Sequence, residues 1–196
     1  LKTETDVRNF GGGWHSDMSF TTKPPLGTML YALEMPDAGG DTMFANTALA
    51  YDALSGGMKD MLDGLVGIYS AALKRGGGRA KSFKAATAMS PKNMDQVEME
   101  AEHPIVRTHP ETGRKALFLG KGHTVRFKDM TEEESLPLIN YLVDHCVRPE
   151  FTCRFSWGVG SLALWDNRCT LHFAIDDYPG QLRRMRRLTV EGDTPV

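Results

Sequence analysis

The sequence predicts a mainly β fold with a few helices, in which two sheets pack against each other as in a jelly roll. Many short segments are rich in β-branched and aromatic residues and are bounded by Gly, Pro or Asp. The few segments with helical periodicity fall in the connections, which favours a sandwich over a βαβ fold. A length of 196 residues with 41% hydrophobic and 24% charged residues suits one domain, residues 1–196, around one core.

The predicted strands are short and lie between turn-forming residues. They cover residues 27–35, 103–108, 115–119, 151–157, 161–166 and 186–191. Two of these segments, FTCRFSW and SLALWDN, are joined by Gly158-Val159-Gly160, and this pattern predicts a β-hairpin.

Helical periodicity occurs in residues 46–65 as two short amphipathic runs that break at Gly56 and Gly57. The second run has the i, i+3, i+4, i+7 spacing of a buried helix face. Its predicted core side chains are Met58, Met61, Leu62 and Leu65.

The clearest predicted helix begins at Thr131, where the sequence TEEE has the capping-box pattern, and ends before Pro149. Pro137 shifts its expected start toward Ser135, because proline is best tolerated in the first turn of a helix.

Charge and hydropathy exclude several classes of partner. The net charge of −2 leaves no basic surface typical of nucleic-acid or anionic-membrane binding, and the basic run LRRMRR at 182–187 is short. No apolar stretch approaches the roughly 18 residues that a membrane helix requires. A small molecule is the expected partner, and the oligomeric state stays open, a homo-oligomer included.

The three cysteines, Cys146, Cys153 and Cys169, are odd in number and lack C-x-x-C spacing. This pattern fits a reducing compartment, the cytoplasm, better than a disulfide framework.

Residues 73–93 are polar, glycine-rich and basic, and they show no convincing periodicity. A loop of this length in a compact domain is typical of either an active-site lid or a disordered connection, and both interpretations stay open.

Three consecutive glycines precede His15-Ser16-Asp17, which suggests that space is needed beside these side chains. On a strand, His15 and Asp17 would point to the same side. The candidates for a third ligand are His103, His109, His123, His145 and His172. We favour His172, because it follows the strand that ends in Trp165-Asp166. Two histidines and one carboxylate are typical of non-haem Fe(II) oxygenases.

Four motifs together, WHSD at 14–17, GGDT at 39–42, WDNRCTLH at 165–172 and the arginine-rich tail, resemble the taurine dioxygenase group of Fe(II)- and 2-oxoglutarate-dependent oxygenases. The resemblance extends from about residue 9 to 195 and implies a double-stranded β-helix, with Fe(II), 2-oxoglutarate and O2 as cofactors. It implies that His15, Asp17 and His172 bind iron. It also implies that Arg183 binds the distal carboxylate of 2-oxoglutarate and that Thr42 is its hydroxyl partner.

The same resemblance implies hydroxylation of a small organic acid, with release of succinate and CO2. Gly11 falls where the taurine enzyme has a substrate-binding asparagine, and His123 falls at the aromatic position that lines its pocket. These differences argue against taurine itself. Arg187 matches the position that contacts the anionic end of the substrate, which suggests a carboxylate or a sulfonate. Asn167 and Asp166 are candidates either for support of the ligands or for simple turn formation.

Two other functions fit the same three ligands. A zinc hydrolase uses two histidines and a carboxylate, but it leaves Arg183 and Thr42 without a role. A non-catalytic jelly-roll module could keep the metal site alone. The family's N-terminal third is also expected to be missing before Leu1, so that the chain is a fragment, a partly ordered protein or a truncated homologue.

Overall fold

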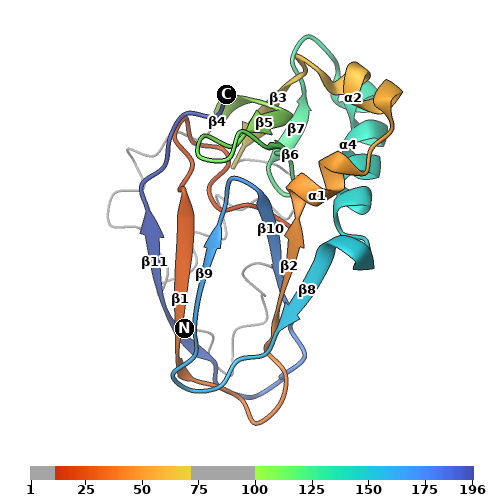
Figure 1. The fold of residues 1–196 in the computed structure, drawn as a ribbon. Helices are drawn as coiled ribbons and strands as arrows, with labels where there is room; N and C mark the ends of the chain where they lie inside the picture. The colour runs from red at the N-terminus through yellow and green to blue at the C-terminus, as the bar shows by residue number, and fades with distance from the viewer. Residues whose placement is uncertain (1–11, 72–99) are drawn as a thin grey trace.

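The computed structural model describes residues 12–71 and 100–196, and its main feature is a pair of three-stranded antiparallel sheets (Figure 1). One sheet has the order β11-β1-β9 and the other β10-β2-β8. The strands of the first are β1 (Gly27–Glu34), β9 (Leu162–Asp166) and β11 (Arg184–Val190). Those of the second are β2 (Thr42–Asn46), β8 (Thr152–Phe155) and β10 (Thr170–Ala174). This arrangement confirms the predicted jelly roll.

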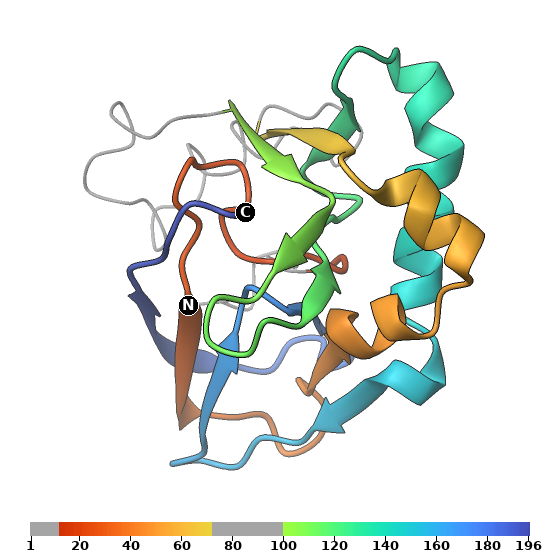
Figure 2. The ribbon, with the colours of Figure 1, turned by 45° about the horizontal axis from the view of Figure 1, so that its top comes forward.

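The remaining strands and the helices lie at one end of the two sheets (Figures 1 and 2). A third sheet has the order β4-β3-β7, and β5 pairs with β6. These strands are β3 (Val66–Ser70), β4 (Glu100–Pro104), β5 (Val106–Thr108), β6 (Lys115–Leu117) and β7 (Thr124–Phe127). The helices are α1 (Thr47–Asp52), α2 (Gly56–Leu62), α4 (Glu132–Cys146) and the 3-10 helix η3 (Pro149–Phe151).

The predicted hairpin between FTCRFSW and SLALWDN is wrong. Strand β8 pairs with β2, whereas β9 pairs with β1, so the connection between them crosses from one sheet to the other. The amide of Gly160 donates to the Ala32 carbonyl and the amide of Ala32 to the Ser161 carbonyl, which fixes the end of the connection on β1. The local Gly-x-Gly pattern specifies a turn, but it does not specify which strand pairs with either flanking segment.

All six predicted strand positions contain strand, although residues 103–108 divide into the end of β4 and β5. The prediction omitted β2, β3, β7 and β10, each of only four or five residues. Segments this short carry little periodicity of their own.

The helical region 46–65 contains two helices that are separated by their caps. Asn46 accepts hydrogen bonds from two amides at the start of α1, and Ser55 accepts one from Met58 at the start of α2. The two glycines therefore lie inside the first turn of α2. Leu62 is fully buried as predicted, but Met61 is 49% exposed, so its assignment to the core is wrong.

Helix α4 has the predicted capping box: the Thr131 hydroxyl accepts from the Glu134 amide, and the Glu134 carboxylate accepts from the Thr131 amide. Its start is not shifted by Pro137, which lies inside the helix and removes one intrahelical donor. The buried face of α4 joins the main core through Ile139, Leu142, Val143 and Cys146.

The segment after β11 passes very close to the chain before β1. A Cβ atom on Gly192 would lie 1.8 Å from the Pro24 carbonyl oxygen and 2.7 Å from the Leu26 nitrogen, both backbone atoms. The Leu26 amide also donates to the Val190 carbonyl. This close approach fixes the end of β11 against the start of β1.

We expect Gly192→Ala to lower the free energy of unfolding by about 1–3 kcal/mol, because backbone atoms must move to admit the methyl group. The matched control is Gly57→Ala in α2, where a Cβ would meet no atom of the described part of the chain within 4 Å. That variant should be more stable than wild type by about 0.5–1 kcal/mol. Urea unfolding measures both, and equal stability of the two variants would contradict the steric argument.

Candidate metal centre

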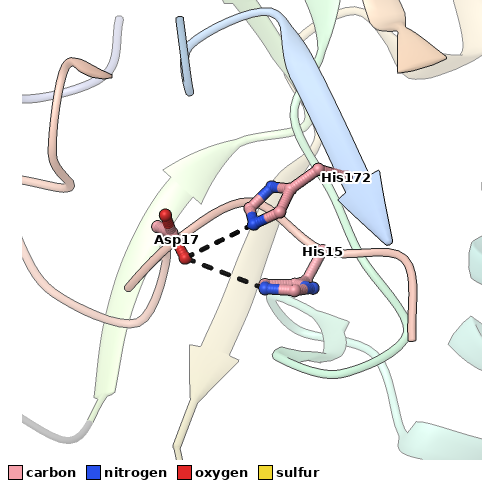
Figure 3. Close-up of side chains that lie close together, drawn as sticks. All are labelled: His15, Asp17 and His172. Atoms are coloured by element: carbon pink, nitrogen blue, oxygen red, sulfur yellow. Dashed lines mark ion pairs between the residues drawn. The ribbon is translucent and has the colours of Figure 1, made fainter. Parts of the chain in front are cut away.

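Three side chains from distant parts of the chain meet between the two sheets. Asp17 Oδ1 lies 3.7 Å from His15 Nε2 and 3.7 Å from His172 Nε2 (Figure 3). Donor atoms of all three residues lie within 4.8 Å of one another, and all three residues are buried. Two imidazoles and a carboxylate that converge in this way are suited to a divalent transition-metal ion.

The backbone around His15 differs from the strand that the sequence suggested. His15 forms an isolated antiparallel bridge with His172, through His15 N to His172 O at 3.1 Å and His172 N to His15 O at 2.9 Å. The chain then turns at residues 17–20, with Met18 at a positive φ of 45°. The bridge sets the two imidazoles side by side, with ring centroids 4.2 Å apart.

The Gly13 carbonyl fixes the orientation of the His15 ring. Its oxygen lies 2.6 Å from His15 Nδ1, so Nδ1 carries the proton and donates, and Nε2 keeps its lone pair toward Asp17. Within residues 12–71 and 100–196, a Cβ on Gly13 would meet no atom within 4 Å. Gly11 lies outside the described residues.

Asp17 is held from two sides. Its Oδ2 accepts a hydrogen bond from the Thr28 hydroxyl at 2.6 Å and lies 2.8 Å from Arg187 Nη2. Burial raises the pKa of Asp17, but charge interactions with His172, Arg187 and His15 and the Thr28 hydrogen bond outweigh it and lower the pKa to about 2. Asp17 is therefore an ionised ligand at neutral pH.

The GGDT motif forms a turn that supports Arg183. Gly39 and Gly40 have positive φ values of 84° and 74°, which favour glycine. Arg183 Nε donates to the Gly40 carbonyl at 3.1 Å, and a Cβ on Gly40 would lie 3.1 Å from Arg183 Cδ. The Gly40 amide donates to the carboxylate of Asp177. The turn therefore holds the guanidinium close to β2.

Thr42 and Arg183 both contact the indole ring of Trp157. Trp157 Nε1 donates to Thr42 Oγ1 at 3.0 Å, and the guanidinium carbon of Arg183 lies 5.9 Å from the Trp157 ring centroid. Thr42 pairs with Ala174 on β10, two residues beyond His172 and on the same side of the sheet. Because the Thr42 oxygen accepts from the indole, its own hydrogen is directed to another acceptor. Burial lowers the pKa of Arg183, while Tyr178 and Asp41 oppose this effect.

Arg187 and His123 both lie beside the three candidate ligands. Arg187 contacts Asp17 and keeps 35% of its side chain exposed. His123 is buried, with its ring centroid 6.5 Å from that of His15 and its Nδ1 2.8 Å from the Ser19 hydroxyl. The predicted loop 73–93 lies outside the described residues.

The other histidines have structural partners. His103 Nε2 is bonded to the Thr21 carbonyl and His145 Nε2 to the Ala50 carbonyl. His109 lies with Asp166 and Cys169 in a second cluster of possible donors within 4.8 Å of one another. The Asp166 carboxylate is already bound by the guanidinium of Arg168 at 2.6 Å. A divalent ion at this cluster would lie beside that positive charge, so we regard the cluster as an ion-pair network.

Sequence reasoning did not single out Thr28, Trp157 or Tyr178. Thr28 of β1 donates a hydrogen bond to Asp17, and Trp157 contacts Thr42 and Arg183. No local motif marks these residues, because their neighbours are distant in sequence. The sequence marks Asn167 as a candidate either for support of the ligands or for turn formation, and in the structure its amide nitrogen donates to the Thr28 hydroxyl at 2.9 Å.

The fold and the site together define a jelly-roll protein with a buried His-Asp-His cluster. The family model described as "Taurine catabolism dioxygenase TauD, TfdA family" matches residues 2–189. The chain therefore belongs to this family. Among the described residues, none of the helices is long and apolar enough to cross a membrane.

Two curated relatives have names that refer to sulfate compounds. An alkylsulfatase of Acinetobacter baylyi is 37% identical over 92% of this chain and 56% of its own length. An alpha-ketoglutarate-dependent sulfate ester dioxygenase of Pseudomonas putida is 38% identical over 93% of this chain and 60% of its own length. The chain thus spans less than two thirds of each of these relatives.

Solved structures agree with the fold. The structure of AAD-2 in complex with Mn(II) and N-oxalylglycine has a TM-score of 0.80 and 33% identity, over 94% of this chain and 70% of that one. A taurine dioxygenase from Burkholderia xenovorans has a TM-score of 0.77 and 35% identity, over 100% of this chain and 60% of that one.

The ion-pair network at Asp166 should make stability depend on pH. Burial raises the pKa of Asp166, but hydrogen bonds from Arg168 and His109 outweigh it, and the pKa lies below its ordinary value of 3.8. The stabilisation of the folded state by this carboxylate is thus complete well above pH 3.8, and it is lost as the pH falls through the lowered pKa. We expect Asp166→Asn to reduce the free energy of unfolding at pH 7 by about 1–3 kcal/mol.

Chemical denaturation of both proteins between pH 2 and 7 measures this effect, and the two curves should converge at the acid end. The control is Asp63→Asn, whose side chain is 75% exposed and 3.6 Å from Lys115. It should change stability by less than about 0.5 kcal/mol. A pH-independent loss in Asp166→Asn would contradict the electrostatic explanation.

Proposed function

We propose that this chain is an Fe(II)- and 2-oxoglutarate-dependent dioxygenase that hydroxylates a small organic acid. The observation that carries the proposal is the convergence of His15, Asp17 and His172, with donor atoms within 4.8 Å. The names of the relatives, which include alpha-ketoglutarate-dependent dioxygenases, support the same chemistry.

The residues fit the cofactors. Two imidazoles whose Nε2 atoms face Asp17 and one carboxylate ionised at neutral pH are a donor set for Fe(II) that leaves other coordination positions to small ligands. When bound, iron and 2-oxoglutarate would supply the activation of O2 and the oxidation of a C–H bond, with release of succinate and CO2. The role of the chain is geometry, orientation and exclusion of water.

Arg183 and Thr42 would bind the distal carboxylate of 2-oxoglutarate. A guanidinium offers planar paired donors that match a carboxylate, and the Thr42 hydrogen is available as a further donor. The Gly40 carbonyl and the Trp157 ring keep Arg183 in place. Burial of this cation strengthens its attraction for an anion.

Arg187 supports an acidic substrate. Its guanidinium lies at the metal-binding carboxylate and is still accessible to solvent, so an anion that enters beside the metal would meet it. The substrates named for relatives, a sulfate ester, a sulfonate and 2,4-dichlorophenoxyacetate, fit an anionic compound. His123 and Gly11 are proposed as further residues of the substrate pocket, and taurine is not favoured.

The zinc hydrolase and the non-catalytic module share the same three ligands. Neither accounts for the arrangement of Arg183, Thr42 and Trp157 around one site. We also propose that residues 1–196 form one domain that works in the cytoplasm, since Cys146, Cys153 and Cys169 are all free thiols.

The first test is succinate formation from 2-oxoglutarate with Fe(II), O2 and a panel of sulfate esters, sulfonates and carboxylates. His15→Ala should abolish turnover. Arg183→Ala should raise KM for 2-oxoglutarate by about 10- to 100-fold, since a hydrogen bond to a charged group contributes about 1.5–3 kcal/mol. Absence of succinate from folded, iron-loaded wild-type protein under every condition would favour the non-catalytic module.

The second test concerns the substrate anion. Arg187→Gln should raise KM for the organic acid about tenfold or more and change KM for 2-oxoglutarate less, although Arg187 also contacts Asp17. The matched control is Arg186→Gln, because Arg186 pairs with Tyr31 and points to the opposite side of the sheet from Arg187. Steady-state kinetics with both variants measures the difference, and an equal effect of the two substitutions would refute a specific role of Arg187.

A further inference from the structure

The two oxygens of Asp17 have separate partners. Oδ1 faces the two imidazoles, whereas Oδ2 is bound by Thr28 and Arg187. Arg187 is partly exposed, but Thr28 is completely buried. Thr28 is therefore the buried partner of Oδ2, and it lies on β1.

The hydrogen bond from Thr28 has a fixed direction. The Thr28 oxygen accepts a hydrogen bond from Asn167 Nδ2 at 2.9 Å. A threonine hydroxyl has one proton, and an amide NH2 group is a donor only, so the Thr28 proton is directed to Asp17.

Trp165 fixes the orientation of the Asn167 amide in the same way. Its indole Nε1 donates to Asn167 Oδ1 at 2.9 Å. Because an indole N–H never accepts, the amide oxygen must face Trp165 and the amide nitrogen must face Thr28. Donor direction is thus determined step by step from Trp165 to Asn167, Thr28 and finally Asp17.

The backbone of Asn167 is tied to the same site. Its amide donates to the Leu26 carbonyl at 2.9 Å, and its carbonyl accepts from the Ser16 hydroxyl at 2.7 Å. Ser16 lies between the two N-terminal candidate ligands. Asn167 is 1% exposed, and its buried polar groups have partners in this network.

We propose that Thr28 and Asn167 are positioning residues for the metal centre, which hold Oδ2 of Asp17 so that only Oδ1 is presented beside the two imidazoles. This role rests on the proposed function of the site. A carboxylate that binds through one oxygen leaves more coordination positions for other ligands. Loss of such supporting hydrogen bonds typically weakens metal binding by about 10- to 100-fold.

The test is Mn(II) binding by the full chain, measured by titration with electron paramagnetic resonance detection of the free ion. Thr28→Val removes the hydroxyl with little change of shape, and we expect the Kd for Mn(II) to rise by about 10- to 100-fold. Asn167→Asp should have a similar effect, because the single Thr28 proton would then face two carboxylates. Thr28→Ser restores the hydroxyl and should bind Mn(II) within about threefold of wild type.

The matched control is Thr47→Val, since Thr47 is also buried and its hydroxyl has no hydrogen-bond partner among the residues that the structure describes. It should leave Mn(II) binding unchanged, and thermal unfolding without metal shows which variants are folded. If Thr28→Val does not fold, Asn167→Asp decides the question.

A Kd for Mn(II) of folded Thr28→Val within about twofold of wild type would overturn the positioning role alone. The same holds for Asn167→Asp if Thr28→Val does not fold. A Kd for Thr28→Ser that rises as much as that of Thr28→Val would also overturn this role. Failure of wild-type protein to bind Mn(II), or wild-type binding that His15→Ala does not weaken, would overturn the proposed metal site and the positioning role together.

Discussion

A buried, ionised carboxylate between two sheets is the constraint on which the rest of the structure depends. Asp17 is 5% exposed, and an isolated charge in such a place would be strongly destabilising. The fold compensates with the Thr28 hydroxyl and the Arg187 guanidinium at Oδ2, while Oδ1 faces the two imidazoles. The same contacts that keep the carboxylate charged also orient it, so stability and ligand geometry have one physical origin.

The jelly roll is suited to enclosing the Asp17 carboxylate because strands that follow one another in the sequence, such as β1 and β2, lie in different sheets. The bridge between His15 and His172 adds the N-terminal segment to the edge of the β10-β2-β8 sheet. Thr28 and Arg187 approach from the β11-β1-β9 sheet. A single hairpin would bring together only residues close in sequence, whereas these four residues span most of the described chain.

The region around Arg183 shows how backbone freedom is used for binding. Gly39 and Gly40 both have positive φ, and the Gly40 carbonyl accepts a hydrogen bond from Arg183. A Cβ on Gly40 would crowd the Arg183 side chain, whereas one on Gly39 would crowd the Asp177 carboxylate. Trp157 then joins the cation to Thr42 of β2. The turn and the aromatic ring hold a half-buried positive charge in advance of any ligand, which reduces the entropy lost when an anion binds.

The sequence by itself determined the residue types at the site and the positions of most elements. The donors His15 and Asp17, the glycine pair of GGDT, the capping box of α4 and the β1 segment are local patterns with local physical causes. The tertiary structure alone decided that β8 and β9 belong to different sheets and that Thr28 supports Asp17. These pairings join segments that are distant in sequence, and no short stretch of sequence contains that information.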